Sequence, residues 1–343
     1  MDFRIALIEG DGVGPEVISA ARAVMDTASK AYGFGLHFEK LRAGDGALSE
    51  VGSALPESTR SKLYECHSCL KGPVGRTASD VIVRLRRELD LFANIRPAKT
   101  IGTPSSSVGE VDMVIVRENT EDLYTGMEFE LADGAVAMKV ITAHASRRIA
   151  EYAARLALSR NRERKITCVQ KSNVLHLTDG LFARTCRETV SSYPDIRYEE
   201  MLVDAAAMNI VRRPSSFDVI VTENLYGDIL SDEAAEIAGG IGLSPSANIG
   251  ERYSIFEPVH GAAFDIAGSN TVNPTAAILS GAMMIRYLGE IYGGSDCIEA
   301  ANAIEVAVKN CIVSGKRTAD LGGNCSTSEF GRNVAMLIRN GSR

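Results

Sequence analysis

Two aspartates four residues apart could bind a divalent metal ion. Asp228 and Asp232 lie in the segment YGDILSDEAAEIAG, which follows a strand-like run and has the apolar spacing of a helix. Both carboxylates should therefore project from one face of that helix, and carboxylate oxygens are ligands that Mg²⁺ and Mn²⁺ prefer. Acids at this spacing repel each other unless a cation separates them, but they are also favourable at a solvated helix N-terminus. The pair alone leaves both interpretations open.

Three arginines could bind an anionic substrate. Arg86 and Arg96 lie in LRRELDLFANIRP around the expected end of a helix, and Arg117 comes directly after the strand-like run VIV. A guanidinium can bind a carboxylate through two parallel hydrogen bonds. A single arginine more often forms a surface salt bridge. Three of them at the ends of elements favour a dicarboxylate substrate, and they strengthen the metal interpretation of the two aspartates.

A Cys-x-x-Cys pair, Cys66 and Cys69, resembles half of a zinc site or a redox motif. Either function would need a second ligand pair or a thioredoxin-like context, and the sequence offers neither. The surrounding segment ECHSCLKGPVG, with His67, instead predicts a short buried strand that runs into a Gly-Pro loop. Seven cysteines, an odd number scattered along the chain, indicate reduced thiols.

The segment GDGVGP (10–15) resembles a dinucleotide-binding fingerprint but does not match it. Pro15 stands where the third glycine is required, and no acidic residue ends a second strand about 20 residues further on. We therefore predict that the fold is not a Rossmann fold. The glycines should allow a tight strand-to-helix turn, with Pro15 at the first helical position.

Strand-like runs alternate with helical patterns along most of the chain. The runs are short and rich in β-branched residues: RIALIEG, DMVIVREN, KITCVQ and FDVIVTEN. This alternation predicts an α/β fold with a mainly parallel sheet flanked by helices. Ligands in such sheets bind beyond the carboxyl ends of the strands. Residues 126–142 alternate around an Asp-Gly turn, which predicts a projecting hairpin.

Composition limits the class of protein. The 343 residues are 45% apolar, enough to bury a large core in two domains or one large α/β unit. There are 37 basic and 44 acidic residues and no basic run, which argues against a nucleic-acid partner. The chain begins with a strand pattern, and no segment has the roughly 18 uninterrupted apolar residues of a membrane span. We expect a cytoplasmic protein without membrane association.

Long motifs along nearly the whole chain resemble the β-decarboxylating dehydrogenases of isopropylmalate, isocitrate and homoisocitrate. These motifs are VRENTEDLYTG, QKSNVLHLTDGLF, VDAAAMNIV, TENLYGDILSDEAAEIAGG and FEPVHGAAFDIAG with the later VNPTAAILSGAMM. The combination of LKGPVG, ASDVIVRLR and HGAAFDIAG resembles the archaeal-type isopropylmalate members most. The resemblance implies an enzyme with the two-domain fold of this family.

The resemblance also implies a set of site residues. In the family, three arginines bind the substrate carboxylates, a tyrosine and a lysine transfer protons, and three aspartates bind Mg²⁺ or Mn²⁺. The matching residues are Arg86, Arg96 and Arg117, then Tyr124 and Lys171, and finally Asp204, Asp228 and Asp232. Family members place the lysine and the first aspartate in the active site of a second subunit. Lys171 and Asp204 therefore imply a homodimer or tetramer.

The implied reaction requires these residue types. Hydride leaves C2 of a 2-hydroxy acid for the nicotinamide as the hydroxyl loses its proton, which a neutral Lys171 can accept. The resulting keto acid loses its 3-carboxylate with the help of a divalent cation acting as a Lewis acid. Tyr124 can then return a proton to C3.

The loop HGAAFDIAG and its neighbours resemble the family's dinucleotide site. The matching cofactor-binding residues are Gly72, Val74, Asn173, His260, Gly261, Ala262, Asp265, Ile266 and Asn273. A carboxylate at Asp265 can accept hydrogen bonds from the ribose diol and would repel a 2′-phosphate. NADP-using relatives carry Lys-Tyr here, so we expect NAD. Phe264 departs from the family pattern, which has a proline at this position.

The helix before Arg86 faces the substrate's 3-substituent in the family. Ile82 and Val83 precede Arg86 by four and three residues and should share its face. An apolar pair would leave a third carboxylate unpaired, at a cost of several kcal/mol. This favours 3-isopropylmalate as substrate. The motif ENTEDLY is more similar to isocitrate enzymes, so isocitrate and homoisocitrate remain alternative substrates. A non-catalytic regulatory subunit of an oligomeric isocitrate dehydrogenase is a further alternative.

The family fold implies a discontinuous first domain. We expect residues 1–98 and 240–343 to form a cofactor-binding domain. Residues 99–239 should form the central domain, which carries the substrate site, the dimer interface and a hairpin clasp near 126–142.

Overall fold

One ten-stranded sheet organises the molecule. The computed structural model describes residues 1–102 and 109–341. The sheet order is β2-β1-β3-β12-β11-β4-β5-β10-β8-β9. The strands are β1 (Asp2–Ile8), β2 (Gly35–Leu41), β3 (Ser68–Lys71), β4 (Ala93–Lys99), β5 (Asp112–Glu118), β8 (Lys165–Gln170), β9 (Arg197–Leu202), β10 (Val219–Thr222), β11 (Pro245–Ile249) and β12 (Ser254–Pro258).

The sheet consists of two parallel parts joined by antiparallel strands. Neighbouring strands are parallel from β2 to β12 and again from β5 to β9. Between them, β11 is antiparallel to β12 and β4, and β4 is antiparallel to β5. Strands β8 and β10 are buried throughout, as expected for parallel strands covered on both faces. The predicted α/β fold with a mainly parallel sheet is confirmed.

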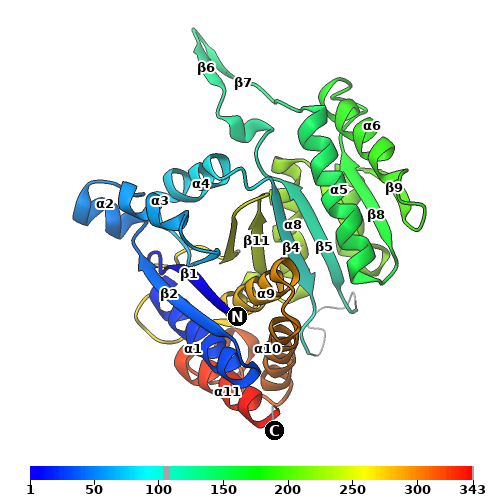
Figure 1. Ribbon diagram of the computed structural model, residues 1–343. Coiled ribbons are helices and arrows are strands. Elements are labelled where there is room, and N and C mark those ends of the chain that lie inside the picture. Colours follow the sequence, from blue (N-terminus) through cyan, green and yellow to red (C-terminus); the bar gives the residue numbers. More distant parts are fainter. Residues whose placement is uncertain (103–108, 342–343) are drawn as a thin grey trace.

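Helices cover the two ends of the sheet in separate groups (Figure 1). On the first parallel part α1 packs against α9, α10 and α11, and on the second α5 packs against α6 and α7 against α8. The helices are α1 (Gly14–Tyr32), α2 (Asp45–Val51), α3 (Glu57–Leu63), α4 (Arg84–Glu88), α5 (Ala143–Arg160), α6 (Thr178–Val190), α7 (Val203–Arg212), α8 (Asn224–Ala238), α9 (Thr275–Tyr292), α10 (Ser295–Val313) and α11 (Thr327–Gly341).

The predicted hairpin is present and projects from the body of the molecule (Figure 1). Within the described residues, strands β6 (Glu128–Leu131) and β7 (Gly134–Ala137) pair with each other and with no other strand. Ala132 and Asp133 occupy the turn, so Gly134 begins the second strand rather than completing the turn as predicted. An isolated two-stranded hairpin is marginally stable in water.

The segment GDGVGP makes the tight strand-to-helix turn that its glycines predict. Gly10 and Gly12 have φ angles of 73° and 58°, which favour glycine. A Cβ atom at Gly12 would lie 1.9 Å from the carbonyl oxygen of Ala262. Pro15 is the second residue of α1, one position later than expected. This turn thus packs directly on a loop from the far end of the sequence.

All seven cysteines are free and buried. Cys66 and Cys69 flank and enter β3, which is completely buried and runs into the Gly-Pro loop, as predicted. Burial raises the pKa of the Cys69 thiol, which keeps it protonated. The structural interpretation of the Cys-x-x-Cys pair is therefore confirmed. In the described part of the chain, no helix is both long and apolar enough to cross a membrane.

The predicted domain boundaries lie at the ends of two central elements. Residue 98 is next to the last residue of β4, and residue 239 caps α8. The antiparallel strands β4 and β11 join the two parts of the sheet at this level. The division into two domains stays a prediction.

We expect Gly12→Ala to reduce stability much more than Gly33→Ala. Both glycines have a positive φ, but a Cβ at Gly33 would meet open space, whereas at Gly12 it would overlap a backbone oxygen. Left-handed backbone strain alone should lower the free energy of unfolding by about 1 kcal/mol at Gly33. At Gly12 the backbone at Ala262 would also have to move, so the free energy of unfolding should fall by about 3 kcal/mol.

Urea unfolding of both variants, followed by circular dichroism, measures this difference. Equal losses for the two variants would contradict the close packing of the turn on the loop that contains Ala262.

Candidate functional site

Two of the predicted arginines contact the predicted aspartates, and the third, Arg86, lies close enough to lower the pKa of Asp228. Arg96 from β4 binds Asp228 at 3.3 Å and Asp232 at 3.1 Å, and Arg117 at the end of β5 forms an ion pair with Asp228. The elements that carry these residues lie together in the middle of the molecule (Figure 1). The structure thus places the predicted cations beside the predicted metal ligands.

Arg117 is deeply buried, and the residues around it are arranged to hold its guanidinium. Its side chain is 1% exposed, Nε donates to Asn224 at 2.8 Å, and Nη2 has no hydrogen-bond partner among the described residues. A Cβ at Gly227 would lie 2.6 Å from Arg117 Cγ, so this glycine allows α8 to pack against the arginine. Burial and Arg96 lower the pKa of Arg117 to about 9, against the opposing effect of Asp228. An unpartnered buried donor of this kind suits an anionic ligand.

Arg86 is oriented by a second buried polar network. It lies in α4, which continues a π-helical turn at Ser79–Val83, a type of irregularity that is frequent at functional sites. Its Nε donates to the amide oxygen of Asn248 at 3.0 Å, and Nη2 lies 3.3 Å from Glu257. The same Asn248 oxygen accepts from Asn94 and Asn119. Because three donors share this oxygen, Asn248 is held in place, and it in turn fixes the Arg86 guanidinium.

The predicted specificity residues lie on the turn before Arg86. Ile82 is buried in an apolar cluster with Val81, Leu85 and Ile255, whereas Val83 is half-buried. The structure therefore leaves Val83 the more accessible of the two.

Tyr124 contacts the same cation–carboxylate group. Its hydroxyl donates to Asp228 Oδ2 at 2.5 Å, and the guanidinium of Arg117 lies 5.0 Å from its ring centroid. Burial and the hydrogen bond to Asp228 raise the pKa of Tyr124, so the phenol keeps its proton. The buried carboxylate of Asp122 accepts hydrogen bonds from the main-chain nitrogens of Leu123 and Leu225, which fixes the tyrosine's turn to the start of α8.

Lys171 and Asp204 form a separate pair. Lys171, just beyond β8, binds Asp204 in the first turn of α7 at 2.5 Å. Across residues 1–102 and 109–341, neither forms a hydrogen bond or ion pair with the arginines or with Asp228. The Asp204 side chain is 65% exposed. The structure therefore does not bring these two residues to the other site residues of the same chain.

Asp228 and Asp232 could supply only part of the ligand set of a hard divalent cation. Asp228 and Asp232 are partly exposed on one face of α8, and burial raises the pKa of Asp228 less than Arg117 and Arg96 lower it, so it is ionised. No group of three or more His, Cys, Asp or Glu side chains suitable for a metal ion occurs within the described ranges. The donor chemistry of these two carboxylates fits Mg²⁺ or Mn²⁺.

Asp11 organises the predicted cofactor loops, a role that the sequence analysis missed. Its carboxylate accepts hydrogen bonds from the main-chain nitrogens of Asp45, Gly46 and Gly75. Asp45 in turn accepts hydrogen bonds from the loop at Thr77. Since Val13 also donates to the Ala262 carbonyl, the GDGVGP turn holds two of the loops that contain predicted cofactor residues, those of Val74 and Ala262. The central acid of GDG was the available signal.

The predicted cofactor residues divide into exposed and buried groups. Asp265, Ile266, Asn173 and Gly261 are exposed, while Gly72, Val74, Ala262 and Asn273 are buried. Asn273 has a structural function, because it donates to Asp320 and accepts from Thr275 at the start of α9. Burial lowers the pKa of His260, and its Nε2 has no hydrogen-bond partner in the described structure. Four of the nine predicted residues are therefore exposed to a ligand, and His260 is half-buried.

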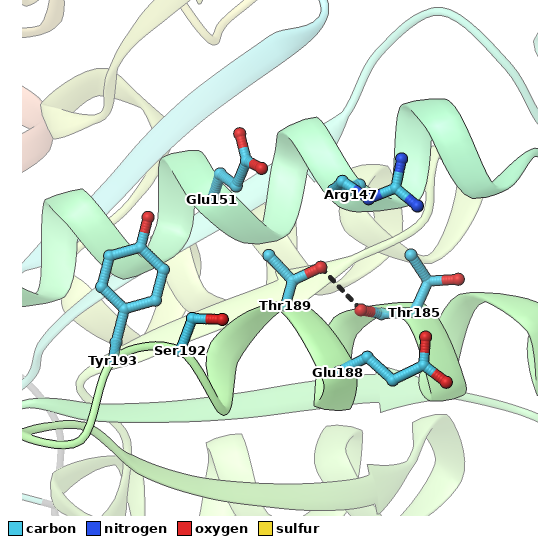
Figure 2. Close-up of a pocket in the computed structure, with 7 residues that line it drawn as sticks. All are labelled: Arg147, Glu151, Thr185, Glu188, Thr189, Ser192 and Tyr193. Carbon is cyan, nitrogen blue, oxygen red and sulfur yellow. Dashed lines mark hydrogen bonds between the residues drawn. The ribbon is translucent and has the colours of Figure 1, made fainter.

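A pocket elsewhere contains none of the predicted residues. It lies between α5 and α6 (Figure 2). Its volume is about 440 Å³. Its lining is polar and mixed in charge: Arg147, Glu151, Thr185, Glu188, Thr189, Ser192 and Tyr193. Thr189 donates to the Thr185 carbonyl, an interaction within the helix. The pocket offers no grouping with obvious chemistry, so the candidate site remains at the arginine–aspartate group.

Fold and site together are those of an α/β enzyme for a small anionic substrate, and the comparisons with known proteins specify the family. Residues 4–334 match the family model described as isocitrate/isopropylmalate dehydrogenase. The chain is 49% identical over 332 residues to the 3-isopropylmalate dehydrogenase of Sulfurisphaera tokodaii, covering 96% of this chain and 97% of that one. It is 47% identical to the isocitrate/homoisocitrate dehydrogenase of Thermus thermophilus, with 99% of both covered.

A solved structure agrees with the sequence matches. The isocitrate dehydrogenase from Methylococcus capsulatus superposes with a TM-score of 0.91 at 39% identity, covering 99% of this chain and 100% of the other. The chain belongs to the isocitrate/isopropylmalate dehydrogenase family and is a decarboxylating dehydrogenase. The resemblance noted in the sequence is confirmed. NAD and a divalent metal ion are general features of this family.

Glu257 should make stability depend on pH in the acid range. Burial raises its pKa, but Lys71 and Arg86 lower it by a larger amount, so that the pKa is about 2. A folded-state pKa below the ordinary value of 4.5 means that the contribution is present above pH 4.5 and is lost as the pH falls toward 2. This shift corresponds to roughly 3 kcal/mol.

Urea unfolding at a series of pH values tests this dependence. Glu257→Gln should be less stable than wild type at neutral pH and should lose less stability as the pH falls below 4.5. The exposed Glu65→Gln serves as control and should follow the wild type. Parallel curves for wild type and Glu257→Gln would contradict the assignment.

Proposed function

We propose that the enzyme oxidises 3-isopropylmalate with NAD and releases CO2 to give 4-methyl-2-oxopentanoate, a step of leucine biosynthesis. The observation that carries this proposal is the group of three arginines around Asp228 and Asp232. It supports binding of a dicarboxylate beside a divalent cation. Several relatives at 46–50% identity over nearly the whole chain bear the name 3-isopropylmalate dehydrogenase.

The arginines can bind the substrate and balance its charge. Arg117 offers an unpartnered buried Nη2, and Arg86 is held by Asn248 and Glu257 with little freedom to move. Fixed donors lose little conformational entropy when a ligand binds. Asp228 and Asp232 would hold Mg²⁺ or Mn²⁺, which when bound supplies Lewis acidity toward the substrate oxygens.

Two side chains would transfer protons. Lys171 accepts the proton of the C2 hydroxyl as hydride passes to the nicotinamide, and Tyr124 donates its phenolic proton toward C3 after CO2 has left. Tyr124 lies within the arginine–aspartate group and is protonated, as this role requires. Lys171 and Asp204 do not reach that group within one chain, which supports their contribution to the site of a second subunit.

Exposed apolar side chains support assembly into a homodimer or tetramer. They lie on the hairpin, on the loop after Lys171 and on the outer faces of α7 and α8: Met127, Phe129, Leu131, Met138, Val174, Leu177, Met208, Val211 and Ile229. Large exposed apolar patches commonly mark protein interfaces. A second copy covering them would stabilise the hairpin and bring Lys171 and Asp204 toward its own arginine–aspartate group.

The exposed loop around Asp265 supports NAD as the cofactor. Asp265 and Ile266 are accessible, and the main-chain nitrogens of Gly268 and Asn270 donate to Glu16 of α1, which holds the loop in place. A carboxylate here favours a ribose diol over a 2′-phosphate. A reaction that uses NAD and a small acid is compatible with a cytoplasmic location.

Isocitrate or homoisocitrate is the second candidate substrate. The Thermus thermophilus relative that is named for both acids is 47% identical to this chain. Against this candidate, Ile82 and Val83 precede Arg86 and offer no partner for a third carboxylate. A non-catalytic regulatory subunit is disfavoured because the complete set of proton-transfer and carboxylate residues is present.

Purified chain should reduce NAD fastest with 3-isopropylmalate in the presence of Mg²⁺. Initial rates with 3-isopropylmalate, isocitrate, homoisocitrate and malate, each with Mg²⁺ or with a chelator, measure this directly. We expect kcat/KM to be at least about tenfold higher for 3-isopropylmalate than for either tricarboxylate, because an unpaired carboxylate costs at least 1.4 kcal/mol. A clear preference for a tricarboxylate would overturn the substrate assignment.

Asp265→Lys combined with Ile266→Tyr should shift the preference from NAD toward NADP. The lysine can bind the 2′-phosphate that the aspartate repels. The ratio of kcat/KM for the two cofactors is the measurement, and the single change Phe264→Pro is the control. An unchanged cofactor ratio in the double variant would count against the assigned loop.

A further inference from the structure

A buried ammonium group joins three elements around the candidate site. Lys139 lies just beyond β7, at the base of the hairpin, and its side chain is 14% exposed. Its Nζ lies 2.7 Å from Asp179 Oδ1, forms an ion pair with Glu223 and lies 4.5 Å from the ring centroid of Tyr226. None of these four residues was singled out by the motifs that point to catalysis.

The two carboxylates hold elements that carry proposed site residues. Asp179, in the first turn of α6, accepts a hydrogen bond from the main-chain nitrogen of Lys171 at 2.7 Å. Glu223 is the N-cap of α8, the helix of Asp228. The ammonium therefore connects the hairpin base with the Lys171 loop and with the helix of the proposed metal ligands.

The hairpin base is also tied to the turn of Tyr124. The main-chain nitrogen of Asp122 donates to the Val140 carbonyl at 2.8 Å, one residue after Lys139. Asp122 also binds the main chain at the start of α8. The segment that contains Lys139 is thus held between the turn that carries the proposed acid and the loop that carries the proposed base.

Charge explains why a lysine is needed at this position. Asp179 and Glu223 have completely buried side chains, and Glu223 Oε1 has no hydrogen-bond partner in the described structure. Burial raises the pKa of Glu223 to about 8, although Lys139 acts in the opposite direction. Without the ammonium, the buried Asp179 side chain would lie beside a second buried acid with no cation between them, which is strongly unfavourable.

We propose that Lys139 is a positioning residue that fixes the loop beginning at Lys171 relative to α8, through Asp179 and Glu223. This inference rests on the proposed function of Lys171 and extends it. Lys139 follows the hairpin by two residues. Packing of the hairpin against a second subunit would therefore also affect the position of the Lys139 ammonium. Assembly and the placement of the proton acceptor are then linked by one side chain.

The test compares Lys139→Met with the matched variant Lys165→Met. Lys165 lies at the opposite end of β8 from Lys171 and is also mostly buried, binding Glu199 at 2.7 Å and the Ser216 carbonyl at 2.9 Å. Both variants remove a partly buried ammonium from the same part of the fold. A loss caused only by lower stability should appear in both.

Lys139→Met should lower kcat at least tenfold while KM for NAD changes less than twofold, because eight of the nine predicted cofactor residues, all except Asn173, lie outside the loop that begins at Lys171. Lys139→Arg, which keeps the charge, should restore most of kcat. By hydrogen–deuterium exchange, the amides of residues 171–177 should exchange at least tenfold faster in Lys139→Met than in wild type. Lys165→Met should change neither kcat nor this exchange, even if it lowers Tm.

Unchanged kcat and exchange in folded Lys139→Met, or equal changes in Lys165→Met, would overturn the proposal. If Lys139→Met does not fold, Asp179→Asn, which keeps the size and removes the charge, must produce the same two effects, and wild-type values would overturn the proposal. The exchange measurement needs no substrate. A wild type inactive on all four acids would therefore refute the proposed function, while the exchange rates still decide the role of Lys139.

Discussion

Guanidinium groups that are buried next to carboxylates set the conditions for the rest of this structure. A buried cation is tolerated only when it is paired and its donors are hydrogen-bonded. Arg117 meets this requirement through Asp228 and Asn224, and the absence of a side chain at Gly227 lets the helix come close enough. The pairing leaves one guanidinium nitrogen without a partner. The same arginine that holds β5 to α8 therefore keeps one N–H group that could bind an anion.

The sheet topology explains why these groups meet. Two parallel parts are joined through β11 and β4, which run antiparallel to their neighbours. Arg96 comes from one of these central strands, and Asn248, which orients Arg86, comes from the other. The first part of the sheet supplies the loops around the GDGVGP turn, and the second supplies the loop of Lys171. The candidate site lies where the two parts join.

Two independent features of the described structure support the proposed assembly with a second subunit. The hairpin β6–β7 pairs with no other strand of the described structure, and the Lys171–Asp204 pair is separate from the arginine–aspartate group. A second subunit would remedy both at once. Lys139, at the base of that hairpin and bound to the carboxylate that holds the Lys171 main chain, offers a direct physical connection between the two.

The sequence by itself determined the fold class and the residue types of the site. Apolar runs alternating with helical patterns predicted the parallel strands, because strands buried on both faces must be apolar throughout. Long ordered motifs identified the family, and Asp228 and Asp232 share a helix face because helical spacing alone dictates it. The sequence did not indicate Asp11, Asn248 or Lys139 as organisers of the site.

Only the tertiary structure decided those roles, because each depends on partners far along the chain. Asp11 acts on main-chain nitrogens of residues more than 30 positions away, and Asn248 on side chains more than 120 positions away. Spacing along a helix or strand carries no information about such partners. A buried polar side chain reveals its function only when the fold shows which donors and charges surround it.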